Sequence, residues 1–237
     1  MILEVQEERP AAFPFWDYVD LAVFAGFAFP SLVASALLAR GLSFVLPVSR
    51  VFDALLMQLV WYGLIFGALV VLLRVRYDRP FWHSLGWRVP FRGMIACLLS
   101  GPVLAIGVGL IGYLIHTPTI KLPMFDQMLA DRPTSILFAA FVVIIGPLCE
   151  ELAFRGFLMP LVMRSLGAYG GIVLTAALFG AMHGYEYEWS WRHMLLISIV
   201  GVVLGWVRYD TGSTAGSTFM HATFNLTQLV AFLAQSK

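Results

Sequence analysis

Long hydrophobic stretches alternate with short polar segments along this sequence. The hydrophobic stretches predict helical membrane spans at about residues 21–39, 51–73, 94–115, 136–164, 168–184, 193–209 and 215–234. Only helices and closed barrels satisfy their backbone hydrogen bonds inside a bilayer, and these stretches are too long and too uniformly apolar for barrel strands. The pattern therefore predicts an all-α fold, a polytopic transmembrane helical bundle of about seven spans.

The polar segments between the spans differ in character. Residues 74–93 combine five arginines with several aromatic side chains, a mixture typical of a segment that lies in the headgroup layer. We interpret this segment as an ordinary interfacial loop. Residues 116–135 contain three prolines, which argue against a regular helix through that connection. Residues 167–171 predict a tight turn between two helices, and residues 211–217 predict a flexible lead into the last span.

The composition agrees with a multi-pass integral membrane protein. Hydrophobic residues make up 60% of the 237 residues and charged residues only 12%, whereas soluble domains carry about 25% charged residues. The net charge of +1 and the lack of a basic stripe argue against a nucleic-acid partner. The expected partners are the lipid bilayer and a membrane protein or peptide substrate. Cys97 and Cys149 both lie in apolar stretches and are expected to act as small hydrophobic residues.

The distribution of lysine and arginine predicts the orientation of the chain. The side that carries the N-terminus has 8 of these residues, the opposite side has 6, and Arg155 lies within a span. Because cytoplasmic loops carry the excess of positive charge, the count favours a cytoplasmic N-terminus.

Charged residues interrupt the apolar pattern at Glu150, Glu151 and Arg155. Each charge costs at least about 2.5 kcal/mol at the bilayer centre. Glu151 and Arg155 are spaced i, i+4, so they can meet on one helix face and offset part of this cost. Glu150 is rotated by about 100° from Glu151 and must find its partner on another helix. The group is either a buried packing network without chemistry or part of a functional site.

Two later spans carry candidate partners for Glu150. His183 ends the fifth span, and His221 and Asn225 share one face of the seventh. Glu150 and His183 lie 16 and 17 residues from the turn near Leu166, so antiparallel helices would bring them level. His221 is only about 6–8 residues into its span and is expected to be shallower. This difference in depth requires either that the fourth and fifth predicted spans project beyond the bilayer or that the seventh starts inside a cavity.

Three motifs on successive hydrophobic segments, Glu150-Glu151-x-x-x-Arg155, Phe179-x-x-x-His183 and His221-x-x-x-Asn225, together resemble the signature of the CPBP family. This family comprises intramembrane proteases related to type II CAAX prenyl endopeptidases and to bacteriocin-processing or immunity (Abi) proteins. The similarity covers about residues 133–232. It implies N-terminal spans with an interfacial segment at 1–93 and a membrane-embedded protease core at 94–237, with four catalytic helices.

The resemblance also implies roles for individual residues. Glu150 and His183 would activate the water that attacks the scissile amide, and His221 and Asn225 would stabilise the oxyanion. Glu151 and Arg155 would support these catalytic residues. The expected activity is that of a hydrolase, an intramembrane endopeptidase that acts on a membrane-associated or lipidated protein or peptide.

Metal dependence and two other functions remain open at this stage. The chain has no His-Glu-x-x-His motif, and we favour a metal-free glutamate mechanism. Zinc held by Glu150, His183 and His221 with an open fourth position is the alternative. Buried Glu, Arg and His would also suit an ion-coupled transporter, although transporters more often show repeated halves. The third alternative is a non-catalytic membrane scaffold or immunity protein.

Overall fold

The computed structural model describes residues 13–45, 50–90, 93–120 and 132–235, and every regular element within these ranges is a helix. The helices, including the π-helical segments η1 and η2, are α1 (Tyr18–Val45), α2 (Arg50–Tyr77), α3 (Phe81–Ser84), α4 (Met94–Leu114), α6 (Arg132–Ala140), η1 (Phe141–Ile145), α7 (Gly146–Glu151), η2 (Leu152–Leu158), α8 (Met159–Met182), α9 (Trp191–Thr211) and α10 (Thr214–Gln235). The predicted all-α class is confirmed.

Five helical runs are long and apolar enough to cross a membrane, and the protein is an integral membrane protein. They are Tyr18–Phe44, Val51–Tyr77, Met94–Leu114, Arg132–Met182 and Trp191–Thr211. Two differences explain why about seven spans were predicted from the sequence whereas five are found. The 51-residue run Arg132–Met182 contains two predicted spans, which meet at Gly167. The last helix, α10, is not among the five and carries polar residues such as His221 and Asn225.

The turn predicted at residues 167–171 is centred on Gly167. Its φ of 72° is a conformation that glycine adopts without a steric cost, and it reverses the chain between the two parts of α8. The absence of a regular helix predicted for residues 116–135 was wrong for the last part of this segment, because α6 begins at Arg132. Pro133 lies in the first turn of α6, where the missing amide hydrogen costs nothing. Residues 121–131 of this connection lie outside the described residues.

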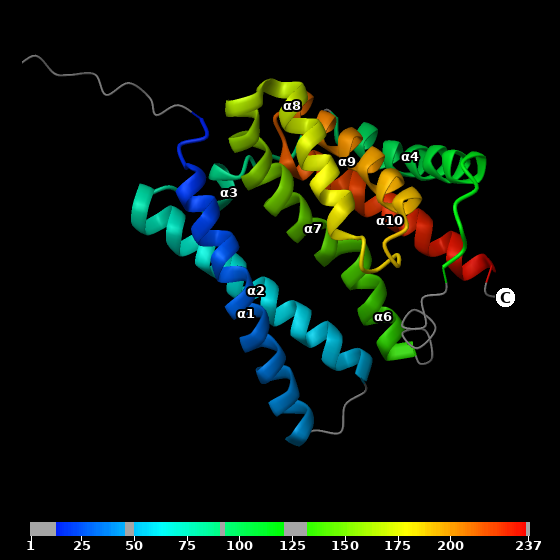
Figure 1. The fold of residues 1–237 in the computed structure, drawn as a ribbon, viewed down its shortest axis with the longest axis horizontal. Coiled ribbons are helices and arrows are strands. Elements are labelled where there is room, and N and C mark those ends of the chain that lie inside the picture. Colours follow the sequence, from blue (N-terminus) through cyan, green and yellow to red (C-terminus); the bar gives the residue numbers. More distant parts are fainter. Residues whose placement is uncertain (1–12, 46–49, 91–92, 121–131, 236–237) are drawn as a thin grey trace, which may run out of the picture.

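The helices form two groups (Figure 1). In the view of Figure 1, α1 and α2 form a hairpin on the left, and α4, α8, α9 and α10 lie together on the right with α6 and α7 between the groups. Within the right-hand group α8 packs against α9 and α4 against α10. A side-chain carbon at Gly101 of α4 would overlap Thr223 and the Met220 carbonyl of α10, so only glycine allows this close approach.

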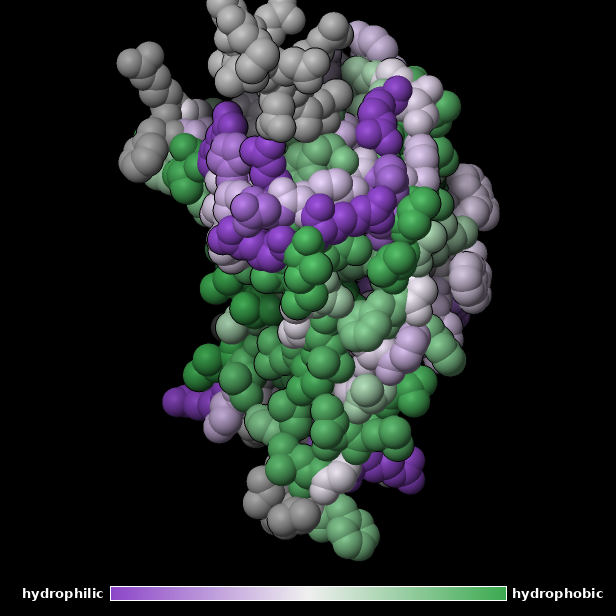
Figure 2. Space-filling view, turned by 90° about the vertical axis from the view of Figure 1, so that its left-hand side faces the viewer, coloured by the Kyte–Doolittle hydropathy of each residue, from purple (hydrophilic) through white to green (hydrophobic). Residues whose placement is uncertain are grey.

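The outer surface of α1 and α2 is suited to lipid. Hydrophobic side chains such as Phe29 and Val71 are exposed on this hairpin. Figure 2 shows this side of the molecule as a broad hydrophobic belt with hydrophilic residues gathered above it and a few below it. The belt is the arrangement that a bilayer requires of a spanning hairpin.

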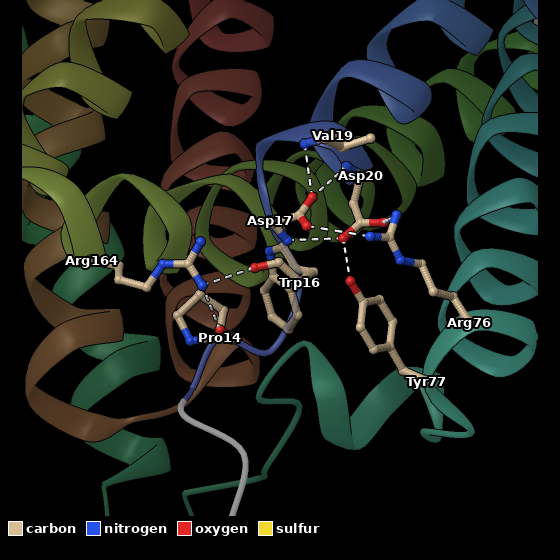
Figure 3. Close-up of polar contacts among 8 residues, drawn as sticks. All are labelled: Pro14, Trp16, Asp17, Val19, Asp20, Arg76, Tyr77 and Arg164. Atoms are coloured by element: carbon tan, nitrogen blue, oxygen red, sulfur yellow. Dashed lines mark hydrogen bonds and ion pairs between the residues drawn. The ribbon is translucent and has the colours of Figure 1, made fainter.

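Polar side chains at the start of α1 tie the hairpin together (Figure 3). Asp20 is fully buried and accepts from Arg76 Nη1 at 2.8 Å, from Tyr77 Oη at 2.5 Å and from the Asp17 amide at 2.8 Å. Arg76 also pairs with Asp17 at 3.3 Å. The Asp20 carboxylate is therefore paired with a cation and hydrogen-bonded, as a buried charge must be.

The same end of α1 is docked on the core. Trp16 is fully buried, stacks on the Phe157 ring and donates from Nε1 to the Phe157 carbonyl at 3.1 Å. Arg164 Nη1 donates to the carbonyls of Pro14 and Trp16 at 3.0 and 3.2 Å, as Figure 3 shows. These contacts fix the N-terminal hairpin against η2 and the start of α8.

The segment interpreted as an interfacial loop is partly buried in the protein. Leu85 is fully buried, and its carbonyl accepts from Thr214 Oγ1 at 2.5 Å, while the Gly86 carbonyl accepts from the Thr214 amide at 3.0 Å. Arg208 Nε donates to Thr214 Oγ1 at 2.9 Å. Residues 85–86 therefore cap α10, whose first residues are buried. The start of α10 is therefore enclosed by protein.

Candidate active site

The two glutamates lie on α7, a six-residue α-helix between the π-helical segments η1 and η2. A π-helical turn contains an additional residue, which rotates the following side chains and often occurs at functional sites. Pro147, near the start of α7, lacks an amide hydrogen and so cannot donate a backbone hydrogen bond within the helix. The local sequence thus accounts for an irregular helix at the position where the charges occur.

Glu151 and Arg155 form the i, i+4 contact expected from their spacing. Arg155 Nη1 donates to Glu151 Oε1 at 2.8 Å, and Nη2 donates to the Gly201 carbonyl at 3.0 Å. The guanidinium carbon lies 4.6 Å from the centroid of the Phe179 ring, within cation–π range. The side chains of Glu151 and Arg155 are 0% and 1% exposed. The two opposite charges therefore neutralise each other inside the protein, out of contact with solvent.

His221 on α10 lies between the two glutamates. Its Nδ1 is 3.1 Å from Glu151 Oε1, and its Nε2 is 3.8 Å from Glu150 Oε2. An ionised carboxylate only accepts hydrogen bonds, so Nδ1 carries a proton and donates to Glu151. Glu151 thereby orients the imidazole so that Nε2 faces Glu150. Nothing in the sequence indicated this contact, because the i, i+4 spacing pairs Glu151 with Arg155 alone.

Glu150 is the carboxylate that remains accessible. Its side chain is 28% exposed, whereas that of His221 is 5% exposed. In contrast, Glu151 Oε2 is buried and has no hydrogen-bond partner among the described residues. Of the two adjacent glutamates, one is enclosed in the protein and the other can reach a water molecule or a substrate.

His183 borders this group without contacting Glu150. Its Nδ1 lies 2.8 Å from the Phe179 carbonyl, which fixes a proton on Nδ1 and leaves Nε2 as the free nitrogen. The Phe179 ring packs on both histidines, with centroid distances of 4.7 Å to His183 and 5.9 Å to His221. Within the described residues, no ion pair joins His183 to Glu150. Phe179 therefore separates the two histidines and sets their positions.

Asn225 is anchored to the first π-helical segment. Its Nδ2 donates to the Val142 carbonyl at 2.8 Å, which fixes the orientation of the amide group. An amide nitrogen has two hydrogens, so one remains free to donate elsewhere. The structure thus joins Glu150, Glu151, Arg155 and His221 directly and places Asn225 one helical turn after His221.

Glu186 is a further charged residue that no motif indicated. It lies in the turn after α8. Loss of hydration raises the pKa of Glu186, His183 opposes this shift, and the charge of Glu150 adds to it. These interactions place its carboxylate in the electrostatic surroundings of both residues. The only sequence signal was its spacing of three residues from His183.

The candidate zinc ligands are not arranged as a metal site. Among the described residues, no group of three His, Cys, Asp or Glu side chains is placed to hold a metal ion together. Nε2 of His221 lies 3.8 Å from Glu150, but within the described residues no ion pair joins His183 to Glu150, so the three side chains do not converge on one point. The residues present therefore do not fit the three-ligand alternative.

Comparison with known proteins locates the match in the part of the chain that builds this site. Residues 132–227 match the family model described as type II CAAX prenyl endopeptidase Rce1-like. No curated protein and no solved structure matches the chain. The matched range runs from α6 into α10 and contains all three motifs.

Proposed function

Through residues 132–227 the chain belongs to the CPBP family of CAAX-type membrane proteases, and we propose that it hydrolyses a peptide bond of a membrane-associated or lipidated substrate. A prenylated C-terminal segment is the first substrate to test, because the matched family is named for that reaction. The proposal includes a cytoplasmic N-terminus, which the excess of positive charge on that side supports.

The contact between Glu150 and His221 carries the proposal. A partly exposed carboxylate lies 3.8 Å from an imidazole nitrogen whose ring is held by a second, buried carboxylate. Peptide hydrolysis needs a base next to a water molecule and hydrogen-bond donors at the oxyanion, in a site shielded from bulk solvent. Glu150 is suited to be the base, and His221 and Asn225 to be the donors.

The reaction follows from these roles. Glu150, supported by His183, accepts a proton from water while the water oxygen attacks the carbonyl carbon of the scissile amide. The oxyanion of the tetrahedral intermediate accepts hydrogen bonds from the free N–H of Asn225 and, when His221 Nε2 is protonated, from that nitrogen. Collapse of the intermediate breaks the C–N bond, and the proton held by Glu150 passes to the leaving nitrogen. The products are a new carboxylate end and a released amine. No step uses a metal ion.

The test uses the full chain in phospholipid vesicles and a fluorogenic peptide that ends in an S-prenylated CAAX sequence. We expect cleavage of this peptide and slower cleavage of the same peptide without the prenyl group. Glu150→Gln keeps the shape of the side chain but cannot accept the proton, so the rate should fall by at least about 10²-fold. His183→Ala should act similarly, and the double variant should be little worse than either, because residues that act as a unit are not additive.

Three results would change this assignment. Full activity of Glu150→Gln would refute the hydrolase mechanism and favour a scaffold. Equal cleavage of both peptides would remove the prenyl group from the proposal but leave the protease. Inactivation of the wild type by a chelator, with recovery on addition of zinc, would overturn the metal-free mechanism.

A further inference from the structure

The N-terminal hairpin forms one wall of the candidate site. Residues Val51 and Leu55 of α2 are buried in a cluster with Phe138 of α6 and Leu229 of α10, and Phe141 of η1 packs against it. This cluster places α2 beside the π-helical segment that leads to the glutamates. The first ninety residues carry none of the three motifs, so nothing in the sequence indicated a contribution from α2.

Tyr62 of α2 is held at this wall by its ring. The ring stacks on that of Phe141, with centroids 6.0 Å apart and planes only 2° from parallel. Phe66 packs edge-on against the same ring at 6.3 Å. The adjacent Trp61 donates from Nε1 to the Ala28 carbonyl at 2.9 Å, which fixes this turn of α2 against α1. The position of the Tyr62 ring is therefore determined by contacts on several sides.

Phe141 and Glu150 lie on the same helical run, on either side of Gly146, so the stack places Tyr62 on the part of α2 beside this run. A side-chain carbon at Gly146 would lie 3.3 Å from the Phe141 carbonyl and 3.8 Å from Glu150 Oε1. The Tyr62 hydroxyl is within electrostatic range of Glu150 and Cys149, and the Gln58 side chain lies beside it. The phenol group of Tyr62 on α2 therefore lies in the neighbourhood of the accessible carboxylate.

Neither His221 nor Arg155 lies within hydrogen-bond distance of Glu150 in a way that would orient its carboxylate. His221 Nε2 is 3.8 Å from its carboxylate, which is longer than a hydrogen bond, and Arg155 is already bound to Glu151. A carboxylate at membrane depth is costly unless donors surround it. A hydroxyl that donates directly or through one water molecule would reduce this cost and fix the direction of the carboxylate.

We propose that Tyr62 is a positioning residue of the proteolytic site, whose hydroxyl orients Glu150 between α2 and α10. This inference rests on the proposed function. It gives the N-terminal hairpin, whose two helices are membrane spans, a role in the site as well.

The experiment compares pH–rate profiles of Tyr62→Phe, Tyr169→Phe and the wild type in vesicles with the prenylated peptide. Tyr62→Phe keeps the ring stack and removes only the hydroxyl. Tyr169→Phe is the matched control, because Tyr169 is exposed on α8 and its ring stacks on Trp206. We expect kcat for Tyr62→Phe to fall about tenfold, the effect of one lost hydrogen bond. The acidic limb of its profile should move to higher pH, because the charged carboxylate loses a donor.

Gln58→Met is a second variant that leaves the tyrosine in place and removes the polar group beside it. A shift of the acidic limb in the same direction would support the proposal. Coincidence of the profiles of Tyr62→Phe and Gln58→Met with that of the wild type would overturn it. Glu150→Gln, measured in parallel, distinguishes failure of the Tyr62 proposal from failure of the proposed function. If Glu150→Gln is inactive while Tyr62→Phe has normal activity, the proposed function stands and the proposed role of Tyr62 is wrong. If Glu150→Gln is fully active, the proposed function itself fails.

Discussion

At the scale of single residues, neighbouring side chains of the same type have different environments. Glu150 and Glu151 are adjacent, yet Glu151 is enclosed with Arg155 and His221 while Glu150 keeps 28% of its side chain exposed. The difference arises because successive residues of a helix point in directions about 100° apart. One direction places Glu151 against Arg155, and the other leaves Glu150 partly exposed. The pair therefore combines a structural carboxylate with one that is available for chemistry.

Replacement of Arg155 by alanine should destabilise the protein. The change removes the arginine from the buried Glu151 carboxylate, and breaking such a fully buried pair costs about 3–5 kcal/mol. We expect lower expression or a lower melting temperature of the detergent-purified protein. Arg132→Ala is the control, because Arg132 is an exposed arginine at the start of α6. Normal stability together with lost turnover would instead make Arg155 a member of the catalytic group.

At the scale of helices, irregular elements flank the glutamates and contact Asn225. The π-helical segments flank the glutamates, and the Val142 carbonyl in the first of them binds Asn225. α10 begins inside the protein because the backbone of residues 85–86 and the side chain of Arg208 bond to Thr214. A buried helix end needs such partners for its backbone groups. This cap fixes how deep His221 lies, since His221 is seven residues further along the same helix.

Thr214→Val should loosen the start of α10. The variant keeps the shape of the side chain but leaves the Leu85 carbonyl and Arg208 Nε without their partner, at a cost of about 1–3 kcal/mol for each group. We expect a lower melting temperature. Thr227→Val is the matched control on the same helix, because the Thr227 hydroxyl bonds the Thr223 carbonyl in its own helix. Equal melting temperatures for the two variants would contradict the capping role.

At the scale of the whole molecule, the N-terminal hairpin is anchored to the core at one end and reaches the site along its length. Trp16 and Arg164 fix the start of α1 on η2 and α8, and the stacked rings of Tyr62 and Phe141 join α2 to η1. These contacts join residues on the two sides of residue 93, which is the predicted boundary between the N-terminal spans and the protease core. The hairpin and the core are thus joined by specific polar and aromatic contacts.

Asp20→Ala tests the anchored end. It removes the acceptor of Arg76 and Tyr77 shown in Figure 3 from a fully buried position. Breaking a buried pair costs about 3–5 kcal/mol, and Arg76 is half-exposed, so we expect the lower end of this range. Limited proteolysis of the vesicle-bound protein should show faster cleavage near α1 than in the wild type. Asp53→Ala, on the same hairpin, removes a bond to Ser43 in the adjacent helix and should leave that cleavage rate unchanged. Equal rates in all three proteins would show that the cluster does not anchor the hairpin.

The sequence by itself determined the class of fold and the local part of the site. Residues close together in the chain determine three features: the apolar spans, the turn at Gly167 and the contact between Glu151 and Arg155. Over such short separations, helix geometry alone determines which side chains can contact each other. The ordered motifs indicated the family because residue type and spacing can be read from the sequence without a structure.

Only the tertiary structure decided which distant side chains meet. The placement of His221 between two glutamates, the burial of Leu85 under α10 and the stack of Tyr62 on Phe141 each join residues more than sixty positions apart. Such contacts depend on how helices pack and at what depth each begins, and hydrophobic pattern does not specify either one. The sequence of α2 therefore gave no sign that one of its tyrosines lies near the catalytic candidate Glu150, because in a bilayer both the lipid-facing and the protein-facing sides of a helix are apolar.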